Sequence, residues 1–302
     1  MGRKLIQHGL SSLTVSLPRK WVKENNLKKG DEIEIEESKG KLMIATQKHP
    51  QHKQIDIDIS NADPMIRRLI GATFKTGYDE VNIKFSSHDE LKAVRDLIKE
   101  QFTGFEIINQ NKDNILVKNI SQDNFEEFNN VLRRFFLVLM NISSETSKAI
   151  EKEDFKWLKN NTLIKYEADK FADYCRRAIN SGYETEFKRT APLYTIIEQL
   201  EKVVDRYKDL CEYASKNKIK LNKNIKSVIK ELAEFQESFY NLFYKFEIQK
   251  LIELGKKKQE LQRNLDGLMT NSTRKEVKIM SLIDRILNLT FDLNGPLMAV
   301  YI

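Results

Sequence analysis

The chain has 302 residues, of which 40% are hydrophobic and 31% charged, and its formal net charge is +7. This composition predicts a folded protein long enough for two or three domains and argues against disorder. No apolar run approaches the roughly 20 residues that span a bilayer, and the polar N-terminus argues against a signal peptide. Cys175 and Cys211 lack CxxC spacing, which suits buried free thiols in a reducing compartment. We expect a cytoplasmic protein.

The first fifty residues alternate strand and helix signals. Residues 12–17 alternate polar and apolar side chains, as a strand with one buried face does, and residues 32–36 do the same. Between them, Pro18 can begin a short basic helix at its first position, where the missing N–H has no intrahelical partner. Residues 25–31 contain two asparagines and a Lys-Gly-Asp turn that end this helix. A further strand is predicted over 41–44.

The stretch LPRKW…NNLKKGDEIEIE, followed by the strand KLMI at 41–44, resembles the AbrB/MazE/SpoVT swapped-hairpin DNA-binding domains. The resemblance covers about the first 46 residues and is specific in order and spacing. In that family two chains interleave their hairpins into one small β-barrel, so the resemblance implies a homodimer formed through a domain at 1–48. Because fewer than fifty residues bury little apolar surface alone, the size of the segment agrees with dimerisation.

Seven Lys and Arg residues fall within the first thirty residues, where Glu24 is the only carboxylate, so this segment carries a concentrated positive field. DNA phosphates are the natural partner of such a field. The resemblance places DNA contacts on the early basic pair and the helix, here Arg3, Lys4, Arg19, Lys20 and Lys23. The chain departs from the family at Thr14, where DNA-binding members often carry Arg, and in a longer first loop, QHGLSS. The alternative is that these cations only solvate a dimerisation module.

Short strands and helices alternate after residue 52, which predicts a small α/β middle domain over 53–120. The expected strands cover 55–59, 81–85, 105–109 and 114–119, and the expected helices cover 64–76 and 88–101. Asp63-Pro64 is predicted to supply an N-cap and a first-position proline, Ser86-Ser87 a second cap, and Gly77 and Gly104 the helix ends. Ser60-Asn61 and Ser86-Ser87 are conceivable anion caps, but capping alone is favoured, and we assign this domain no ligand.

From about Asp123 onward the sequence has almost no strand pattern and only two prolines, Pro192 and Pro296, which predicts an all-α region over 121–302. The clearest apolar seam runs from Leu193 to Ala214 with three- and four-residue spacing. Three helices followed by three more suggest an internal duplication. The expected segments are 123–149, 153–180, 187–216, 222–246, 248–269 and 273–293.

A second resemblance lies in these helices. The segments LEKVVD at 200–205, LIDRILN at 282–288 and EADKF at 167–171 look like helix motifs of the PhoU family. PhoU proteins are paired three-helix bundles that regulate phosphate uptake, and the combination with an AbrB-type head is an arrangement associated with archaeal regulators. The fold class expected for the whole chain is therefore multidomain α+β: a dimeric N-terminal barrel, a small α/β domain and a PhoU-like bundle of two three-helix halves.

Members of the PhoU family hold metal clusters with carboxylates spaced E-x3-D. Here only Glu201 and Asp205 keep that pair, because Asn288 follows Asp284 at the same spacing and Lys165 precedes Asp169. We expect Glu201, Asp205, Asp169 and Asp284 to pair with Arg and Lys on adjacent helices. Neither a metal nor a cofactor is expected.

Enzyme signatures are missing from the sequence. The four histidines, His8, His49, His52 and His88, lack HExxH spacing, and no P-loop, GxSxG or GxGxxG motif occurs. The leading hypothesis is a DNA-binding transcriptional regulator of phosphate uptake or phosphate response, whose helical domain senses or docks a partner. The alternative is an adaptor that uses the head only for dimerisation and binds a phosphate transporter or a signalling protein. A metal-storing bundle is a third possibility.

Overall fold

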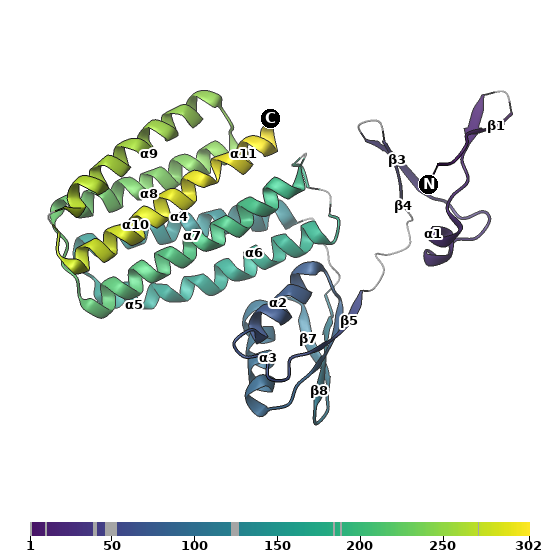
Figure 1. The fold of residues 1–302 in the computed structure, drawn as a ribbon, viewed down its shortest axis with the longest axis horizontal. Coiled ribbons are helices and arrows are strands. Elements are labelled where there is room, and N and C mark those ends of the chain that lie inside the picture. Colours follow the sequence, from purple (N-terminus) through teal and green to yellow (C-terminus); the bar gives the residue numbers. More distant parts are fainter. Residues whose placement is uncertain are drawn as a thin grey trace. The chain divides into compact units, whose positions relative to one another are not determined.

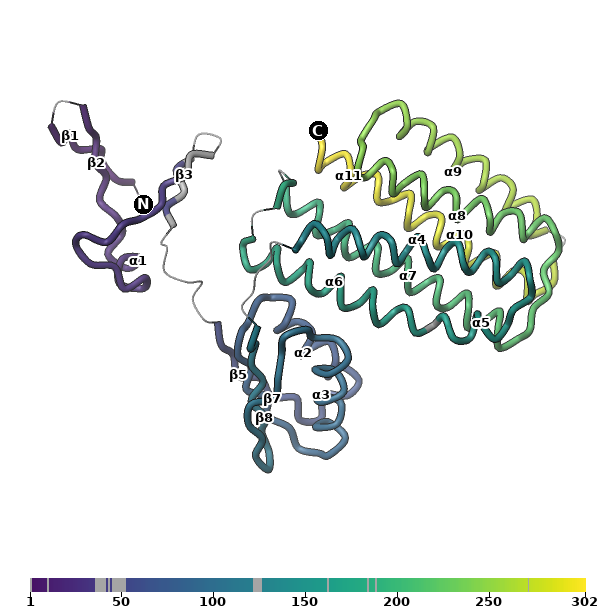
Figure 2. Tube along the Cα trace, turned by 180° about the vertical axis from the view of Figure 1, so that it is seen from behind, coloured from purple at the N-terminus to yellow at the C-terminus, as the bar shows by residue number. Residues whose placement is uncertain are grey.

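The computed structural model describes residues 2–9, 11–38, 41–45, 53–121, 127–183, 185–187, 189–270 and 272–302. The chain divides into two compact units, Met1–His52 and Lys53–Ile302. Figure 1 labels the helices and strands, and Figure 2 shows the same trace from behind. His49 and His52, which the sequence analysis considered, lie outside the described residues.

The N-terminal unit contains two separate antiparallel hairpins. Strand β1 (Ile6–His8) pairs with β2 (Ser12–Thr14), and β3 (Glu34–Ser38) pairs with β4 (Lys41–Ala45), each as a two-stranded sheet. The short helix α1 (Arg19–Glu24) connects them. Since the described strands of one chain make two open sheets rather than a closed one, the barrel of the swapped-hairpin family would require a second copy.

Three details of this unit differ from the sequence prediction. Strand β1 was expected to be loop, yet it pairs Ile6 with Thr14 and forms a hairpin whose turn includes Gly9 at a positive φ of 72°. The partner strand then ends at Thr14 instead of continuing to residue 17. Pro18 is the N-cap of α1, with extended backbone (ψ 126°), so it lies one position before the first helical residue.

The α/β part of the second unit forms a four-stranded sheet in the order β5-β6-β8-β7. β5 and β6 are parallel, and the other pairs are antiparallel. Helices α2 and α3 lie together on one side of the sheet (Figures 1 and 2) and share an apolar core with it. The elements are β5 (Gln54–Asp58), α2 (Ile66–Thr76), β6 (Glu80–Lys84), α3 (His88–Gln101), β7 (Phe105–Gln110) and β8 (Asn114–Asn119).

The predicted caps of α2 and α3 were partly wrong. Asp63-Pro64 does not start α2: residues 62–65 form a turn closed by the Met65 N–H and the Ala62 carbonyl, 2.6 Å apart, and Met65 is the N-cap. Ser87 caps α3 in a capping box with Glu90, and Gly77 ends α2 in the left-handed region, as predicted. Gly104 has a positive φ but lies in the turn beyond the α3 cap, because that helix ends at Gln101.

The C-terminal region is helical, as predicted. Helices α4, α6 and α7 contact one another, as do α8, α9 and α10, and the pairs α4–α8 and α7–α10 join the two groups. These long helices lie side by side (Figures 1 and 2). The bounds are α4 (Phe128–Lys152), α5 (Phe155–Asn160), a 3-10 turn (Asn161–Leu163), α6 (Ile164–Asn180), α7 (Thr190–Asn217), α8 (Lys223–Tyr244), α9 (Ile248–Met269), α10 (Arg274–Asp292) and α11 (Asn294–Tyr301).

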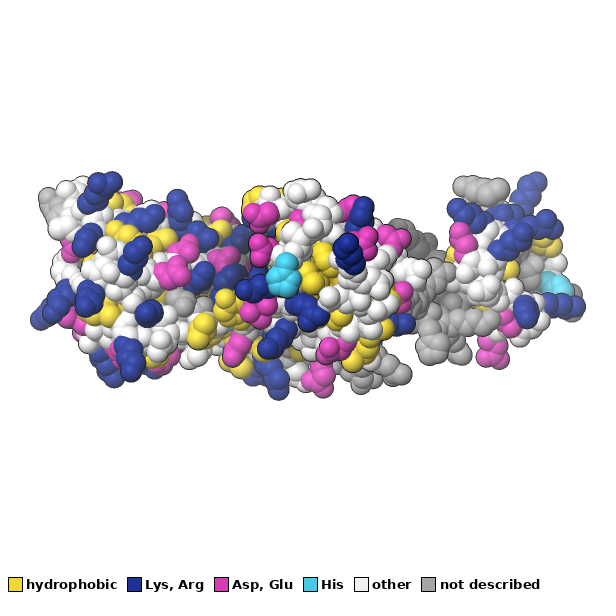
Figure 3. Space-filling model, turned by 90° about the horizontal axis from the view of Figure 1, so that it is seen from below, with side chains coloured by type: hydrophobic (Ala, Val, Ile, Leu, Met, Phe, Trp, Pro, Cys, Tyr) yellow, Lys and Arg dark blue, Asp and Glu magenta, His cyan; other side chains and the backbone are white. Residues whose placement is uncertain are grey.

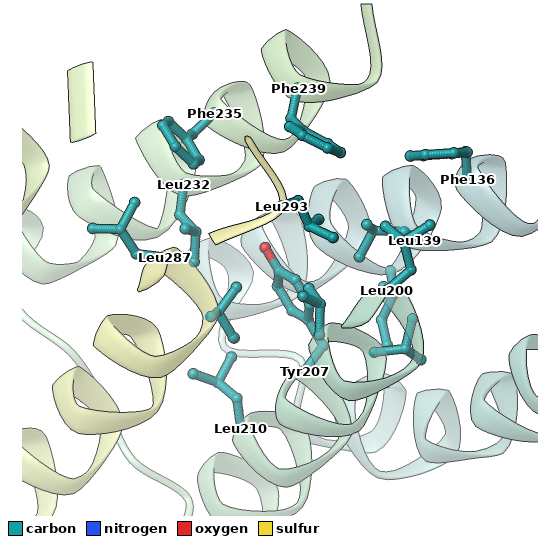
Figure 4. Close-up of a cluster of buried hydrophobic side chains, with 14 of the residues drawn as sticks. Phe136, Leu139, Leu200, Tyr207, Leu210, Leu232, Phe235, Phe239, Leu287 and Leu293 are labelled. Atoms are coloured by element: carbon teal, nitrogen blue, oxygen red, sulfur yellow. The ribbon is translucent and has the colours of Figure 1, made fainter. Parts of the chain in front are cut away.

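One apolar core holds these helices together. Figure 4 shows side chains of α4, α7, α8 and α10 that converge in it, including Phe136, Leu200, Phe239 and Leu287. The predicted seam of α7 is buried along its whole length. Cys175 and Cys211 are buried free thiols, and burial raises the pKa of Cys211 to about 11, as desolvation of a thiolate requires.

A buried arginine of α6 connects the helical region to the α/β part. Arg177 is 2% exposed, and its guanidinium contacts the Asp79 carboxylate at 2.6 Å and donates to the Tyr78 carbonyl at 2.7 Å. The same guanidinium lies 5.3 and 5.1 Å from the ring centroids of Phe74 and Phe105. The regions predicted as separate domains at 53–120 and 121–302 therefore share a buried polar contact within one compact unit.

Candidate nucleic-acid interface

Helix α1 presents its cations to solvent. Arg19, Lys20 and Lys23 are exposed, whereas Trp21 and Val22 on the other side are half-buried. A helix of one or two turns is marginal by itself in water, so it depends on its end groups. Asn25 supplies one of them, because both its backbone and its side-chain N–H groups donate to the Trp21 carbonyl, at 3.1 and 2.9 Å.

The early basic pair lies next to the start of this helix. The Arg3 guanidinium donates to the Ser16 hydroxyl at 3.4 Å, and Ser16 precedes the α1 N-cap by two residues. Lys4 is exposed. The two basic segments, far apart in sequence, are thus brought together by the β1–β2 hairpin. We call Arg3, Lys4, Arg19, Lys20 and Lys23 the basic face.

The ion pair that Lys20 of the basic face forms is exposed. Lys20 forms an ion pair with Glu24 at 3.7 Å, but the two side chains are 87% and 54% exposed, so water screens most of this attraction. In Figure 3, Lys and Arg side chains gather on one part of the N-terminal unit. Such a face attracts phosphates without regard to base sequence, because phosphate contacts position a protein on DNA and do not specify bases.

The N-terminal unit also exposes an apolar surface. None of its described side chains is buried, and six large apolar residues are 45–66% exposed. Single exposed apolar residues are ordinary, but six within a unit of this size leave it without a core of its own. We call this set the apolar face of the head; it consists of Leu5, Ile6, Leu13, Val15, Ile35 and Leu42.

Three of the four carboxylates compared with PhoU motifs form ion pairs with the chain's own cations. The Lys165 ammonium lies 2.7 Å from the Asp205 carboxylate of α7 and 2.9 Å from Asp169, one turn along α6. Burial lowers the pKa of Lys165, but its two carboxylate partners outweigh this and hold the pKa above its usual value. The ion pair predicted for Asp205 with an adjacent helix is confirmed, whereas Asp169 pairs with a lysine of its own helix because Lys165 lies one turn before it.

Arg176 forms the second part of this network. Its guanidinium is 2% exposed and contacts the carboxylates of Asp173, Glu198 and Glu201. Burial raises the pKa of Glu201, and Arg176 opposes that shift. The Gln101 amide of α3 donates to Asp173 at 2.6 Å and extends the network to the α/β part. The ion pair predicted for Glu201 is confirmed.

Asp284 differs from the prediction. It accepts hydrogen bonds from the Gln262 amide at 2.7 Å and the Asn288 amide at 3.1 Å, where a Lys or Arg partner was expected. Asp284 meets neutral amides instead of a cation because α9 places Gln262 next to it. In the described part of the chain, no group of three or more His, Cys, Asp or Glu side chains has the geometry of a metal site.

The caps considered as anion sites in the α/β part already hold a carboxylate. Glu90 accepts hydrogen bonds from the backbone N–H groups of Asn61, Ser86 and Ser87, at 2.7, 2.7 and 3.0 Å. Capping alone is confirmed for Ser86-Ser87, whereas Ser60-Asn61 does not cap α2, because Met65 is the N-cap of that helix and the Asn61 N–H donates to Glu90 instead. No local pattern indicates that a single side chain would cap two turns so far apart in the sequence.

Comparison with known proteins identifies one domain. A family model described as antidote-toxin recognition MazE, a bacterial antitoxin, matches residues 10–52, which agrees with the resemblance seen in the sequence. No curated protein and no solved structure matches the chain significantly. Residues 10–52 thus carry an AbrB/MazE-like domain, a type that suggests a regulatory role. Among the described helices, none is long and apolar enough to cross a membrane.

Proposed function

We propose that this protein is a non-enzymatic, DNA-binding transcriptional regulator. The observation that supports the proposal best is the basic face on a MazE-like domain, where Arg19, Lys20 and Lys23 project from one short helix and Arg3 lies at its start. A second copy of the chain covers the apolar face of the head and doubles the number of cations available to one duplex. DNA is the polyanion that such a dimer fits.

In this proposal the helical region provides regulation. It senses or docks a partner and thereby changes the DNA affinity of the head, which requires a ligand that prefers one of two arrangements. The resemblance of residues 167–171, 200–205 and 282–288 to PhoU motifs suggests phosphate uptake or phosphate response as the regulated process. A phosphate transporter or a signalling protein would then be the partner.

A gel-shift titration at several salt concentrations tests the DNA claim. Five phosphate contacts per head predict that log Kobs falls against log salt with a slope of about −4.5 per head, because each neutralised phosphate releases condensed counterions. Lys20→Glu with Lys23→Glu should abolish binding. The matched control, Lys216→Glu with Lys256→Glu, makes the same change of net charge on α7 and α9 and should bind as the wild type does. Undetectable or salt-insensitive binding of the wild type to genomic fragments contradicts the proposal.

A second candidate function is an adaptor that does not bind DNA. It is favoured by exposed apolar side chains on the helical region, of which Ile248 is 63%, Ile252 47% and Tyr301 41% exposed. In this version the head only dimerises, and the helices bind a transporter or signalling protein. The description of the matching family adds a toxin as a possible partner of the head. Affinity capture should then give the same partner from the wild type and from the Lys20→Glu, Lys23→Glu variant.

A further inference from the structure

A groove of about 720 Å³ lies between α4 and α8. This volume is within the range of small-molecule sites in proteins, roughly 300–1,000 Å³. Serines of α4 line its middle, lysines and Glu151 line one end, and Glu234 and Glu237 line the other. The groove belongs to the helical region and includes none of the residues of the basic face.

The groove exists because the chain carries small side chains where the same two helices elsewhere carry aromatic ones. Toward the start of α4, Phe136 packs against Phe239, Tyr240 and Phe243 of α8 and fills the space. Farther along α4, residues 143–147 include three serines, and Ala233 lies on the α8 side. Two helices packed at a constant spacing leave a hollow where their facing side chains are short.

Three of the five lysines that line the groove lack carboxylate partners among the residues that the structure describes. Lys152, Lys223 and Lys230 line the groove and are exposed, and none of them forms an ion pair with any residue that the structure describes. Lys226 differs: its ammonium lies 3.8 Å from the Glu153 carboxylate and donates to the Glu151 carbonyl at 3.2 Å, which links the end of α4 to the start of α8. Lys148 forms an ion pair with Glu145. Lys152, Lys223 and Lys230 therefore remain available to an anion.

The position of two lysines at the start of α8 costs helix stability. Lys223 and Lys226 fall at the start of α8, where the helix dipole favours acidic side chains, and the first turn of α8 contains no acidic residue. In contrast, the first turn of α10 carries Glu276 in a capping box. If helix stability alone had determined the sequence at the start of α8, we would expect an acidic residue in its first turn, as in α10. An anion bound in the groove would offset the unfavourable placement of Lys223 and Lys226.

Hydroxyl groups form the middle of the groove. Ser144 and Ser147 are half-buried, and neither makes a hydrogen bond to another described residue. Ser143, 1% exposed, also lines the groove, and its hydroxyl donates to the Met140 carbonyl at 2.9 Å. The hydroxyls of Ser144 and Ser147 can exchange hydrogen bonds with a polar occupant.

We propose that the α4–α8 groove binds a small phosphate ester of a polyol, such as a sugar phosphate. The phosphate contacts Lys152, Lys223 and Lys230, and the ligand's hydroxyl groups exchange hydrogen bonds with Ser144 and Ser147. A docked protein segment fits less well, because none of the large apolar side chains that the second unit exposes lines the groove. The role of this groove as the effector site of a regulator rests on the proposed function, whereas the binding of the phosphate ester to the groove does not.

Titration calorimetry of the full-length protein without DNA tests the inference, with glucose 6-phosphate, inorganic phosphate and glucose as probes. Glucose 6-phosphate should bind saturably and more tightly than phosphate, and glucose should not bind. Lys223→Glu with Lys230→Glu should weaken binding at least tenfold, and Ser147→Leu should do so by filling the groove without a change of charge. Lys216→Glu with Lys256→Glu, on α7 and α9, should have no effect.

The head carries cations of its own, so its contribution must be separated. Lys20→Glu with Lys23→Glu should keep wild-type affinity for glucose 6-phosphate; if it loses that affinity, the phosphate ester binds the head and the inference is wrong. It is also wrong if no probe binds saturably, or if phosphate binds as tightly as the ester. Gel shifts of the Lys223→Glu, Lys230→Glu variant without ligand should equal those of the wild type. Loss of ligand binding in the groove can therefore be told apart from loss of DNA binding by the head.

Discussion

Arg177 is the residue whose loss should cost the second unit most stability. Its buried guanidinium contacts Asp79 and the carbonyls of Phe74 and Tyr78, so Arg177→Ala removes the cation that pairs with Asp79 and one donor from each of the two carbonyls. Removing one partner of a buried ion pair costs about 3–5 kcal/mol. We expect a loss of this size in the free energy of unfolding measured with urea.

The control for this change is Arg68→Ala, which removes an exposed arginine of α2 and should alter the free energy of unfolding by no more than about 0.5 kcal/mol. Arg177→Lys should recover only part of the loss, because an ammonium cannot reproduce the planar fork that reaches acceptors on both sides. If Arg177→Ala unfolds at the wild-type urea concentration, the contact between the α/β part and the helices contributes little.

Glu90 should make the stability of the protein depend on pH in the acid range. The backbone N–H of Ser86, followed by that of Asn61, holds the pKa of this carboxylate below its usual value of 4.5. A group whose pKa is lower in the folded state stabilises that state above its unfolded pKa, and the contribution disappears as the pH falls through the folded pKa. Stability should therefore decline below about pH 4.5.

The measurement is the melting temperature between pH 6 and pH 3 for the wild type and for Glu90→Gln. The variant should melt lower than the wild type at pH 6, and the difference should shrink toward pH 3 because a protonated glutamate and the glutamine that replaces it are both neutral. A difference that stays constant over this range would show that the carboxylate's charge is irrelevant. Asp89→Asn, on the exposed side of α3, is the matched control.

At the scale of elements, Pro296 makes the sequence pattern predict the end of the last helix too early. The sequence pattern predicts that the last helix ends before Pro296, yet this proline is the third residue of α11, where its nitrogen lacks only a hydrogen bond that the first turn never makes. The helix buries Leu297 completely, and the Arg189 guanidinium donates to its Ala299 carbonyl at 2.8 Å. The C-terminus thus belongs to the bundle.

We therefore expect Leu297→Ala to lower the free energy of unfolding by about 2–5 kcal/mol, the cost of deleting a buried leucine side chain and leaving a cavity. Met298→Ala, next to it but 37% exposed, should cost much less. Equal effects of the two changes in urea denaturation would mean that α11 is not packed on α7 in solution.

Local patterns predicted most elements well because their causes are local. The α7 seam was predicted residue by residue, since an apolar face at helical spacing has to be buried. Strand β1 was missed because three residues, Ile6–His8, are too few to show alternation. The start of α2 was misplaced because a proline at a helix start and a proline in the preceding turn look alike in sequence.

Contacts between distant parts of the sequence were the part that could not be predicted. Nothing in the sequence shows that Arg177 reaches Asp79, 98 residues away, or that α4 and α8 leave a groove beside Ser144 and Ser147. The sequence predicted that the carboxylates of these helices would pair with Lys or Arg side chains, because buried carboxylates need partners, and Lys165 and Arg176 are such partners. Which cation meets which carboxylate depends on how the helices are placed.

At the scale of the whole molecule, dimerisation depends on the apolar face of the head. In a monomer, Leu13 would stay 63% exposed, and its replacement by aspartate would then cost little. In a dimer the same change buries a carboxylate in an apolar interface, which is expensive unless the carboxylate is paired. We expect wild-type protein to have in solution twice the 35.4 kDa mass of one chain, and Leu13→Asp to shift it toward the monomer.

Light scattering after size-exclusion chromatography measures the mass, and Ser11→Asp, in the exposed β1–β2 turn, adds the same charge outside the apolar face as a control. DNA affinity should fall together with dimerisation, because one head engages a duplex with half the cations and without the gain of a linked second site. If Leu13→Asp remains a dimer with wild-type DNA affinity, the apolar face is not the interface, and the helical region must hold the two chains together.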